Sequence, residues 1–144
     1  MKTDIVAIAS DHAGFELKEK LKEEISKLGL KAEDLGTKGS ESVDYPDYAE
    51  ALVKWMRLHS GGRGVLICGS GIGMSIAANR HKGIRAALVH NGIEAELARK
   101  HNNANVLCLG ARTTNNLSAK EALKTFLNTA FEGGRHEKRV EKLG

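Results

Sequence analysis

The sequence predicts an α/β fold in which five short parallel strands form one sheet and helices cover both of its faces. Short apolar runs alternate with longer amphipathic stretches along the chain, a pattern that implies successive βαβ units. Some runs, such as residues 64–68, are strongly apolar, as expected of strands buried on both faces. The 144 residues contain no internal repeat and no linker, so residues 1–144 are predicted to form a single domain.

Apolar runs and the helical spacing of apolar residues predict each element in order. The predicted strands span residues 5–9, 31–35, 64–68, 85–89 and 106–109. The predicted helices span residues 15–28, 48–59, 74–79, 93–100, 118–127 and 134–142. Gly29 is expected to end the first helix, Pro46 stands where the second could begin, and Ser118 is the expected N-cap of the fifth.

Composition narrows the classes of function. Aromatic residues make up only 4% of the chain, which leaves few platforms for stacking the bases of single-stranded nucleic acid. The net charge of +4 is spread over predicted helix faces, so it favours an anionic small molecule over nucleic acid. No apolar run is long enough to cross a membrane or to serve as the apolar region of a signal peptide.

The two cysteines, Cys68 and Cys108, both follow apolar runs and are predicted to lie in or at the ends of buried strands. Two isolated cysteines indicate neither a disulfide scaffold nor a zinc site. They fit a reducing environment, so we expect a cytoplasmic protein.

Polar and ionisable residues gather where the predicted strands end. The segments concerned are Ser-Asp-His at 10–12, Cys-Gly-Ser at 68–70, His-Asn at 90–91 and Gly-Ala-Arg at 110–112. The carboxyl ends of parallel strands meet at one edge of a sheet, and ligands of open α/β sheets bind there. This edge is therefore predicted to form the functional site.

The stretch VLICGSGIGMSIAANR, residues 65–80, runs from an apolar strand through a cysteine and three alternate glycines into a helix. Gly69, Gly71 and Gly73 allow successive backbone N–H groups to face one point, and the helix adds its positive end, so an anion cradle is predicted. The spacing differs from the dinucleotide fingerprint, and neither its acidic residue nor a phosphate-loop lysine is present. The alternative is that the glycines only form a tight turn.

Cys68 ends this strand beside the glycines and a helix N-terminus, surroundings that favour a thiolate. It is therefore a candidate nucleophile or general base, and a plain core thiol is the alternative. Cys108 lies within an apolar run without polar neighbours and is predicted to be a core residue.

Three other groups carry two interpretations each. Asp11 or His12 could cap the first helix as well as face the site. His101 stands at the end of a helix, at the opposite edge of the sheet, and would reach a site only across an oligomer interface. Arg135 and Arg139 lie four residues apart on one helix face; the pair suits a phosphate, but spacing alone favours a solvated charged tail.

Six segments of the chain, taken in order, resemble the type B ribose-5-phosphate isomerases, in the group that also contains the galactose-6-phosphate isomerase subunits. The segments are SDHAGFELK (10–18), DLGT (34–37), DYPDYA (44–49), GVLICGSGIGMSIAANRHKGIRAA (64–87), ARKHNNANVLCLGAR (98–112) and EGGRHEKRV (132–140). The resemblance covers almost the whole chain. It implies a Rossmann-like three-layer α/β/α fold and a homodimer with sites built by both subunits, and it implies that neither a metal nor a cofactor is needed.

The resemblance implies reversible isomerisation of ribose 5-phosphate and ribulose 5-phosphate, a step of the non-oxidative pentose phosphate pathway. His101 would help to open the sugar ring, and Cys68 would move a proton from C2 to C1 through a cis-enediolate. Ser70 stands where many relatives have threonine, which also offers a hydroxyl. Cys68 places the chain in the cysteine subtype, since some members use a carboxylate base instead.

The resemblance assigns the remaining site residues as well. The sugar hydroxyls would be held and polarised by Asp11, Tyr45 and Ser70, and the oxyanion by the backbone N–H groups of Gly69, Gly71, Ile72 and Gly73. The phosphate would be bound by His12, Arg112, Arg135 and Arg139. His101, Asn102 and the two tail arginines would be lent by the neighbouring subunit.

Several alternatives stay open at this stage. The substrate could be a six-carbon sugar phosphate, such as allose 6-phosphate or galactose 6-phosphate, a choice set by residues 43–47 and Asn91. A nucleotide-binding module without chemistry and a thiol-redox protein are further alternatives. The missing acidic residue counts against the first, and the lack of a resolving cysteine near Cys68 counts against the second. A tetramer is the alternative to the dimer.

Overall fold

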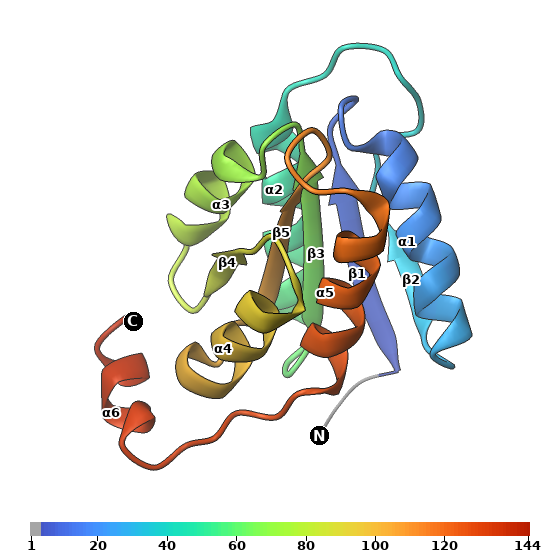
Figure 1. Ribbon diagram of the computed structural model, residues 1–144. Helices are drawn as coiled ribbons and strands as arrows, with labels where there is room; N and C mark the ends of the chain where they lie inside the picture. The colour runs from blue at the N-terminus through green and yellow to red at the C-terminus, as the bar shows by residue number, and fades with distance from the viewer. Residues whose placement is uncertain (1–3) are drawn as a thin grey trace.

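The computed structural model describes residues 4–144 and shows one parallel sheet of five strands with helices on both faces (Figure 1). The strands are β1 (Ile5–Ser10), β2 (Lys31–Asp34), β3 (Arg63–Cys68), β4 (Ala86–Leu88) and β5 (Val106–Gly110). The helices are α1 (Phe15–Lys27), α2 (Tyr45–Leu58), α3 (Ile72–Asn79), α4 (Gly92–Asn102), α5 (Asn116–Asn128) and α6 (His136–Glu141). The predicted fold class is confirmed; residues 1–3 of the predicted domain lie outside the described residues.

The strand order is β2-β1-β3-β5-β4, and every neighbouring pair is parallel. From β1 the chain first adds β2 on one side and then crosses to add β3 on the other. In open α/β sheets, ligands bind at the carboxyl ends of the two strands where this reversal occurs. The strand order therefore indicates a ligand site at the carboxyl ends of β1 and β3, where Ser10 and Cys68 lie.

Two apolar cores lie on opposite faces of the sheet, because alternate side chains of a strand point to opposite faces. Val6 and Ile8 of β1 pack in the core that includes α1, α4 and α5, whereas Ala7 and Ala9 pack in the core that includes α2 and α3. Helix α6 stands apart from the sheet and contacts α4 (Figure 1). Within residues 4–144, no helix has the length and apolar content needed to cross a membrane.

The structure corrects the predicted starts of three helices. Ser118 is not an N-cap: Asn115 caps α5, and its side chain accepts the N–H of Ser118 at 2.8 Å, the third helical position. Helix α2 begins at Tyr45, with Pro46 in its first turn, where a missing N–H costs no hydrogen bond. Helix α3 begins at Ile72, so part of the glycine turn is already helical.

An ion-pair cluster joins α1 to the end of β2. The side chain of Lys18 is fully buried, and its Nζ lies 2.7 Å from Asp34 Oδ2 and 3.2 Å from Glu19 Oε2. Lys22 Nζ lies 2.8 Å from the same Asp34 oxygen, and Asp34 Oδ1 accepts the N–H of Gly36 at 2.9 Å. Burial alone would raise the pKa of the Asp34 carboxyl, but the hydrogen bonds from Lys18, Lys22 and Gly36 outweigh it and hold that pKa below its ordinary value.

Asp34→Asn is expected to lower the free energy of unfolding at pH 7 by about 1–3 kcal/mol, because buried Lys18 loses a charged partner. The Asp34 pKa is lower in the folded than in the unfolded state. Its stabilisation is therefore complete above the ordinary carboxyl pKa and is lost as the pH falls through the folded pKa. Urea unfolding should show the gap between wild type and variant shrinking as the pH is lowered from about 5 towards 2.

Glu33→Gln is the matched control, because Glu33 is an exposed carboxylate on the same strand. It should change the free energy of unfolding by less than about 0.5 kcal/mol. An equal loss of unfolding free energy in both variants would contradict the stabilising role of the Asp34 ion pairs. So would a difference between wild type and Asp34→Asn that persists at low pH.

Candidate active site

An open cavity of about 570 Å³ lies at the carboxyl ends of β1, β3 and β5. Most of the predicted site residues line it, namely Asp11, Tyr45, Cys68, Gly69, Ser70, Ile72, Gly73 and Arg112. Ile76 and Thr113 also line it and were missed by the sequence analysis. Thr113 directly follows the strand-end segment 110–112, and Ile76 lies four residues after Ile72 on the same helix face, so both signals were present.

Cys68 is the last residue of β3 and is only 5% exposed. Its Sγ accepts the backbone N–H of Gly71 at 3.2 Å. Gly71 has φ +77°, a left-handed conformation that bends the chain back so that this N–H faces the sulfur. A donor aimed at the sulfur stabilises negative charge there, so the glycine turn serves the thiol directly.

Gly73 makes room for Tyr45. A Cβ on Gly73 would lie 2.5 Å from the ring of Tyr45, far inside van der Waals contact. Helix α2, which begins at Tyr45, thereby presses its first side chain against the first turn of α3. The absence of a side chain at position 73 sets the place of the tyrosine at the cavity wall.

The loop after β5 is bound to the same turn. The N–H of Ala111 donates to the carbonyl of Cys68 at 2.9 Å, and the N–H of Arg112 donates to the carbonyl of Gly69 at 2.8 Å. A Cβ on Gly69 would come within 3.1 Å of Arg112 Nη1, so the guanidinium lies against the turn. Ser70 Oγ accepts the N–H of Ile72 at 3.2 Å, which leaves the hydroxyl proton available to a ligand.

The loop after β1 supplies Asp11 and His12. Asp11 is 6% exposed, and its Oδ1 accepts the N–H of Gly14 at 3.1 Å. The N-cap of α1 is Gly14, without a side-chain cap, so neither Asp11 nor His12 caps this helix. Nδ1 of His12 accepts the N–H of Val43 at 3.1 Å, which ties this loop to the loop before α2 and leaves Nε2 as the donor of a neutral ring.

The remaining predicted residues lie elsewhere in the chain. His101 and Asn102 close α4 and, together with Arg139, line a smaller cavity of about 230 Å³ between α4 and α6. Arg135 directly precedes α6. As its place before β5 predicts, His101 lies toward the amino edge of the sheet, away from Cys68. The structure thus divides the predicted site into two groups within one chain.

The model of the family described as Ribose/Galactose Isomerase matches residues 6–143. The chain belongs to this family. Ribose-5-phosphate isomerase B from Escherichia coli is 40% identical over 138 residues, which cover 96% of this chain and 93% of that one. A ribose 5-phosphate isomerase structure from Thermotoga maritima is 52% identical, covers 96% of both chains and has a TM-score of 0.93. The structure of ribose-5-phosphate isomerase B from Mycoplasma genitalium with bound ribulose-5-phosphate is 40% identical, with a TM-score of 0.92, and covers 96% of this chain and 93% of that one.

These matches confirm the resemblance inferred from the six sequence segments and identify the protein as an isomerase. The second cysteine of this family member has the predicted core position: Cys108 is fully buried in β5. Burial raises the pKa of its thiol, and the neighbouring Cys68 raises it further. Cys108 is therefore held as a neutral thiol, and Cys68 alone of the two lines the cavity.

Another cavity, of about 490 Å³, lies at the amino edge of the sheet and is lined by Arg63, Arg85 and Arg99. Burial lowers the pKa of all three guanidinium groups. They donate to backbone carbonyls, including Leu127 from Arg63, Asn103 from Arg85 and Thr129 from Arg99. The arginines thus hold loop and helix ends together, and neither cysteine lines this cavity.

Gly73→Ala is expected to push Tyr45 out of the cavity wall and to raise KM for the sugar phosphate by about tenfold, the equivalent of 1.4 kcal/mol. Steady-state kinetics would measure it. Gly39→Ala is the matched control, since no atom lies within 4 Å of the added Cβ, and it should leave KM unchanged. Unaltered kinetics in Gly73→Ala would contradict the predicted role of Tyr45 in substrate binding.

Proposed function

We propose that the protein interconverts ribose 5-phosphate and ribulose 5-phosphate. The observation that carries the proposal is the Cys68 thiol, which faces a cavity with a backbone N–H aimed at its sulfur. Further support comes from the Mycoplasma genitalium relative, the structure of which contains bound ribulose-5-phosphate. The family description also names galactose, so a six-carbon sugar phosphate is the alternative substrate.

Cys68 acts as the general base. The thiolate takes the proton from C2 of the open-chain aldose and leaves an enediolate. The hydroxyl proton of O2 then passes to O1, and the thiol returns its proton to C1 as the C2 carbonyl forms, so no atom is gained or lost. The negative charge alternates between the sulfur and the enediolate oxygen. The N–H of Gly71 stabilises it on the sulfur. The N–H of Ile72 is bound to Ser70 Oγ, and the N–H of Gly73 in the first turn of α3 is available to the enediolate. One such donor commonly contributes about 3–4 kcal/mol in acyl-transfer enzymes.

Polar side chains around the thiol bind the sugar. Asp11, Ser70 and Tyr45 line the cavity, and they hold and polarise the hydroxyl groups of the sugar. Arg112 and His12 bind the phosphate from the same subunit. Arginine suits this role because its forked donors match phosphate oxygens. Proton transfer by a thiol requires neither a metal nor a cofactor, and the two free cysteines fit a cytoplasmic location.

The second group of residues reaches the site from another copy of the chain. Ile93, Leu97 and His101 follow one another at four-residue intervals, so they share one face of α4. Ile93 and Leu97 are 74% and 44% exposed, an apolar surface that is costly to leave in water. Helix α3 has a comparable stripe, since Ile72 and Ile76 are each 53% exposed.

The α3 stripe borders the Cys68 cavity, whereas the α4 stripe carries His101, and both helices flank the β4 side of the sheet (Figure 1). A two-fold pairing of these stripes would bring His101 of one subunit to the Cys68 of the other. His101 then assists ring opening, and Asn102, Arg135 and Arg139 complete the sugar and phosphate contacts. We propose a homodimer with shared sites, with a tetramer of two such dimers as the alternative.

Cys68→Ala is expected to lower kcat by at least about a thousandfold while binding of ribose 5-phosphate changes less than tenfold, because the variant lacks the base but keeps the binding residues. Ribulose 5-phosphate formation with EDTA present and calorimetric titration would measure the two quantities. Cys108→Ala is the matched control and should retain most of the wild-type kcat. Affinity that falls as far as turnover would make Cys68 a packing residue.

The shared site can be tested by mixing two inactive variants. A dimer of one Cys68→Ala chain and one His101→Asn chain contains one doubly altered site and one intact site. Co-expression with two different tags and isolation of the mixed dimer should therefore restore about half of the wild-type kcat per dimer. Mixed dimers as inactive as either parent would place Cys68 and His101 of the same chain in one site.

A further inference from the structure

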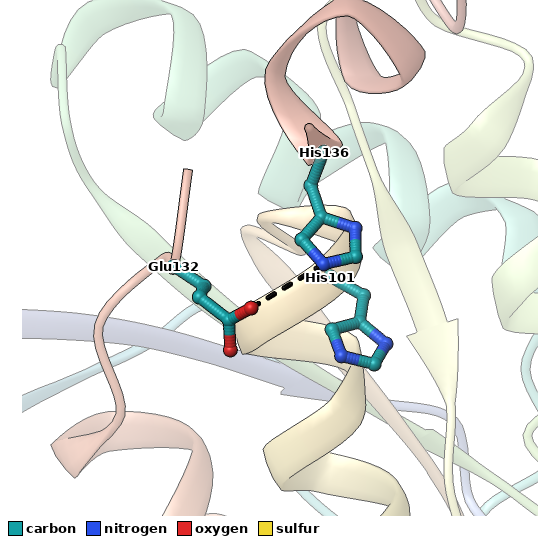
Figure 2. A group of neighbouring side chains, drawn as sticks. All are labelled: His101, Glu132 and His136. Atoms are coloured by element: carbon teal, nitrogen blue, oxygen red, sulfur yellow. Dashed lines mark ion pairs between the residues drawn. The ribbon is translucent and has the colours of Figure 1, made fainter. Parts of the chain in front are cut away.

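Three potential metal ligands meet beside α6. Figure 2 shows His101 from the end of α4, Glu132 from the segment between α5 and α6, and His136 from the start of α6. One ligand atom from each lies within 4.8 Å of the other two. The grouping is fixed by the backbone, because the N–H of Glu132 donates to the carbonyl of Lys100 at 3.1 Å. Glu132 and His136 have no part in the isomerase site proposed above.

His136 is unusually buried for a residue at the start of a short terminal helix, since only 5% of it is exposed. Its Nε2 is shielded from solvent and makes no hydrogen bond to any described residue. The nearest carboxylate oxygen, Glu132 Oε1, lies 3.5 Å away, beyond the usual range of a strong hydrogen bond. A buried ring nitrogen without a hydrogen bond is costly, and coordination of a cation would satisfy it.

The two imidazoles stack with their centroids 4.3 Å apart and their planes inclined by 16°. Both rings lie beside the Glu132 carboxylate (Figure 2). A shared ion needs the lone pairs of both rings to point at it, so each ring must turn about its Cβ–Cγ bond. The energy of this torsion has broad minima, and the neighbouring cavity of about 230 Å³ gives the rings room to turn.

Two imidazoles and one carboxylate are a donor set that binds Zn²⁺ in proteins, with water in the fourth tetrahedral position. The Glu132 carboxylate offsets part of the positive charge of the ion, whereas the positive charge of Arg139 on the cavity wall disfavours binding of the ion. We propose that His101, Glu132 and His136 form a site for Zn²⁺ or a similar transition-metal ion.

The ion at this site acts as an inhibitor. It occupies a ring nitrogen of His101 and ties α6 to α4, so His101 no longer assists ring opening. This consequence rests on the proposed function, whereas binding of the ion does not. The site therefore makes the isomerase sensitive to free transition-metal ions through His101 and not through the Cys68 thiol.

Co²⁺ reports the site directly, because tetrahedral Co²⁺ absorbs visible light. The titration uses Cys68→Ala protein, which removes the one cavity thiol that could bind the ion instead. We expect about one Co²⁺ per chain with tetrahedral visible bands. The bands should be lost when Glu132→Gln or His136→Asn is added. Glu132 is exposed, so its variant stays informative if loss of buried His136 impairs folding.

Glu50→Gln is the matched control. Glu50 Oε1 lies 2.6 Å from Nε2 of His81, a histidine–carboxylate pair outside the three-ligand cluster. It should leave the Co²⁺ bands unchanged. If the bands persist in Glu132→Gln and His136→Asn, or vanish equally in Glu50→Gln, the proposed site is wrong.

Activity then tests the inhibition in protein that keeps Cys68. Zn²⁺ should inhibit the wild type and Glu50→Gln equally, EDTA should reverse it, and Glu132→Gln should need at least about tenfold more Zn²⁺ while its basal activity stays close to wild type. Equal sensitivity of Glu132→Gln would overturn the inhibitory role and assign inhibition to Cys68. The Co²⁺ titration is independent of turnover, so failure of the metal site and failure of the isomerase assignment are distinguishable.

Discussion

A strand buried on both faces can present a reactive group only at its end, and the architecture of this isomerase depends on that constraint. All six residues of β3 are buried, and the strand pairs with β1 on one side and β5 on the other. The chain after β3 first becomes accessible to a ligand at the glycine turn that follows Cys68. Hydrogen bonds from Gly71, Ala111 and Arg112 converge on Cys68 and Gly69, so the thiol and the walls of its cavity are fixed together.

The sequence predicted most of this arrangement, because burial and chain reversal leave local patterns. The apolar run at 64–68, the alternate glycines and the polar strand ends located the cavity correctly. Helix starts were harder to predict, because Asn115 and Ser118 are both suitable caps and only the backbone decides between them. Asp11 was a plausible cap for the same reason, yet its carboxylate binds the N–H of Gly14 before the helix begins.

Other features depend on geometry that no pattern of residues encodes. The hydrogen bond from Gly71 to the sulfur requires a left-handed glycine at one position of the turn, and the contact between Gly73 and Tyr45 joins segments distant in sequence. The stacking of His101 on His136 likewise depends on the path that the backbone takes after α5, which no local sequence pattern indicates. Glu132 and His136, four residues apart on either side of two glycines, were the available signal for that cluster.

The central position of β3 also determines when the Cys68 thiol becomes protected during folding. Ala7 pairs with Gly64, and Gly64 with Val106, so both ladders close only after long intervening loops have been ordered. Such non-local pairing slows folding, because loop entropy is lost before the contacts form. Until both ladders close, Cys68 and Cys108 are equally open to oxidants. In the folded chain the two thiols differ in accessibility, because Cys108 is fully buried within the sheet and Cys68 lies at its carboxyl edge.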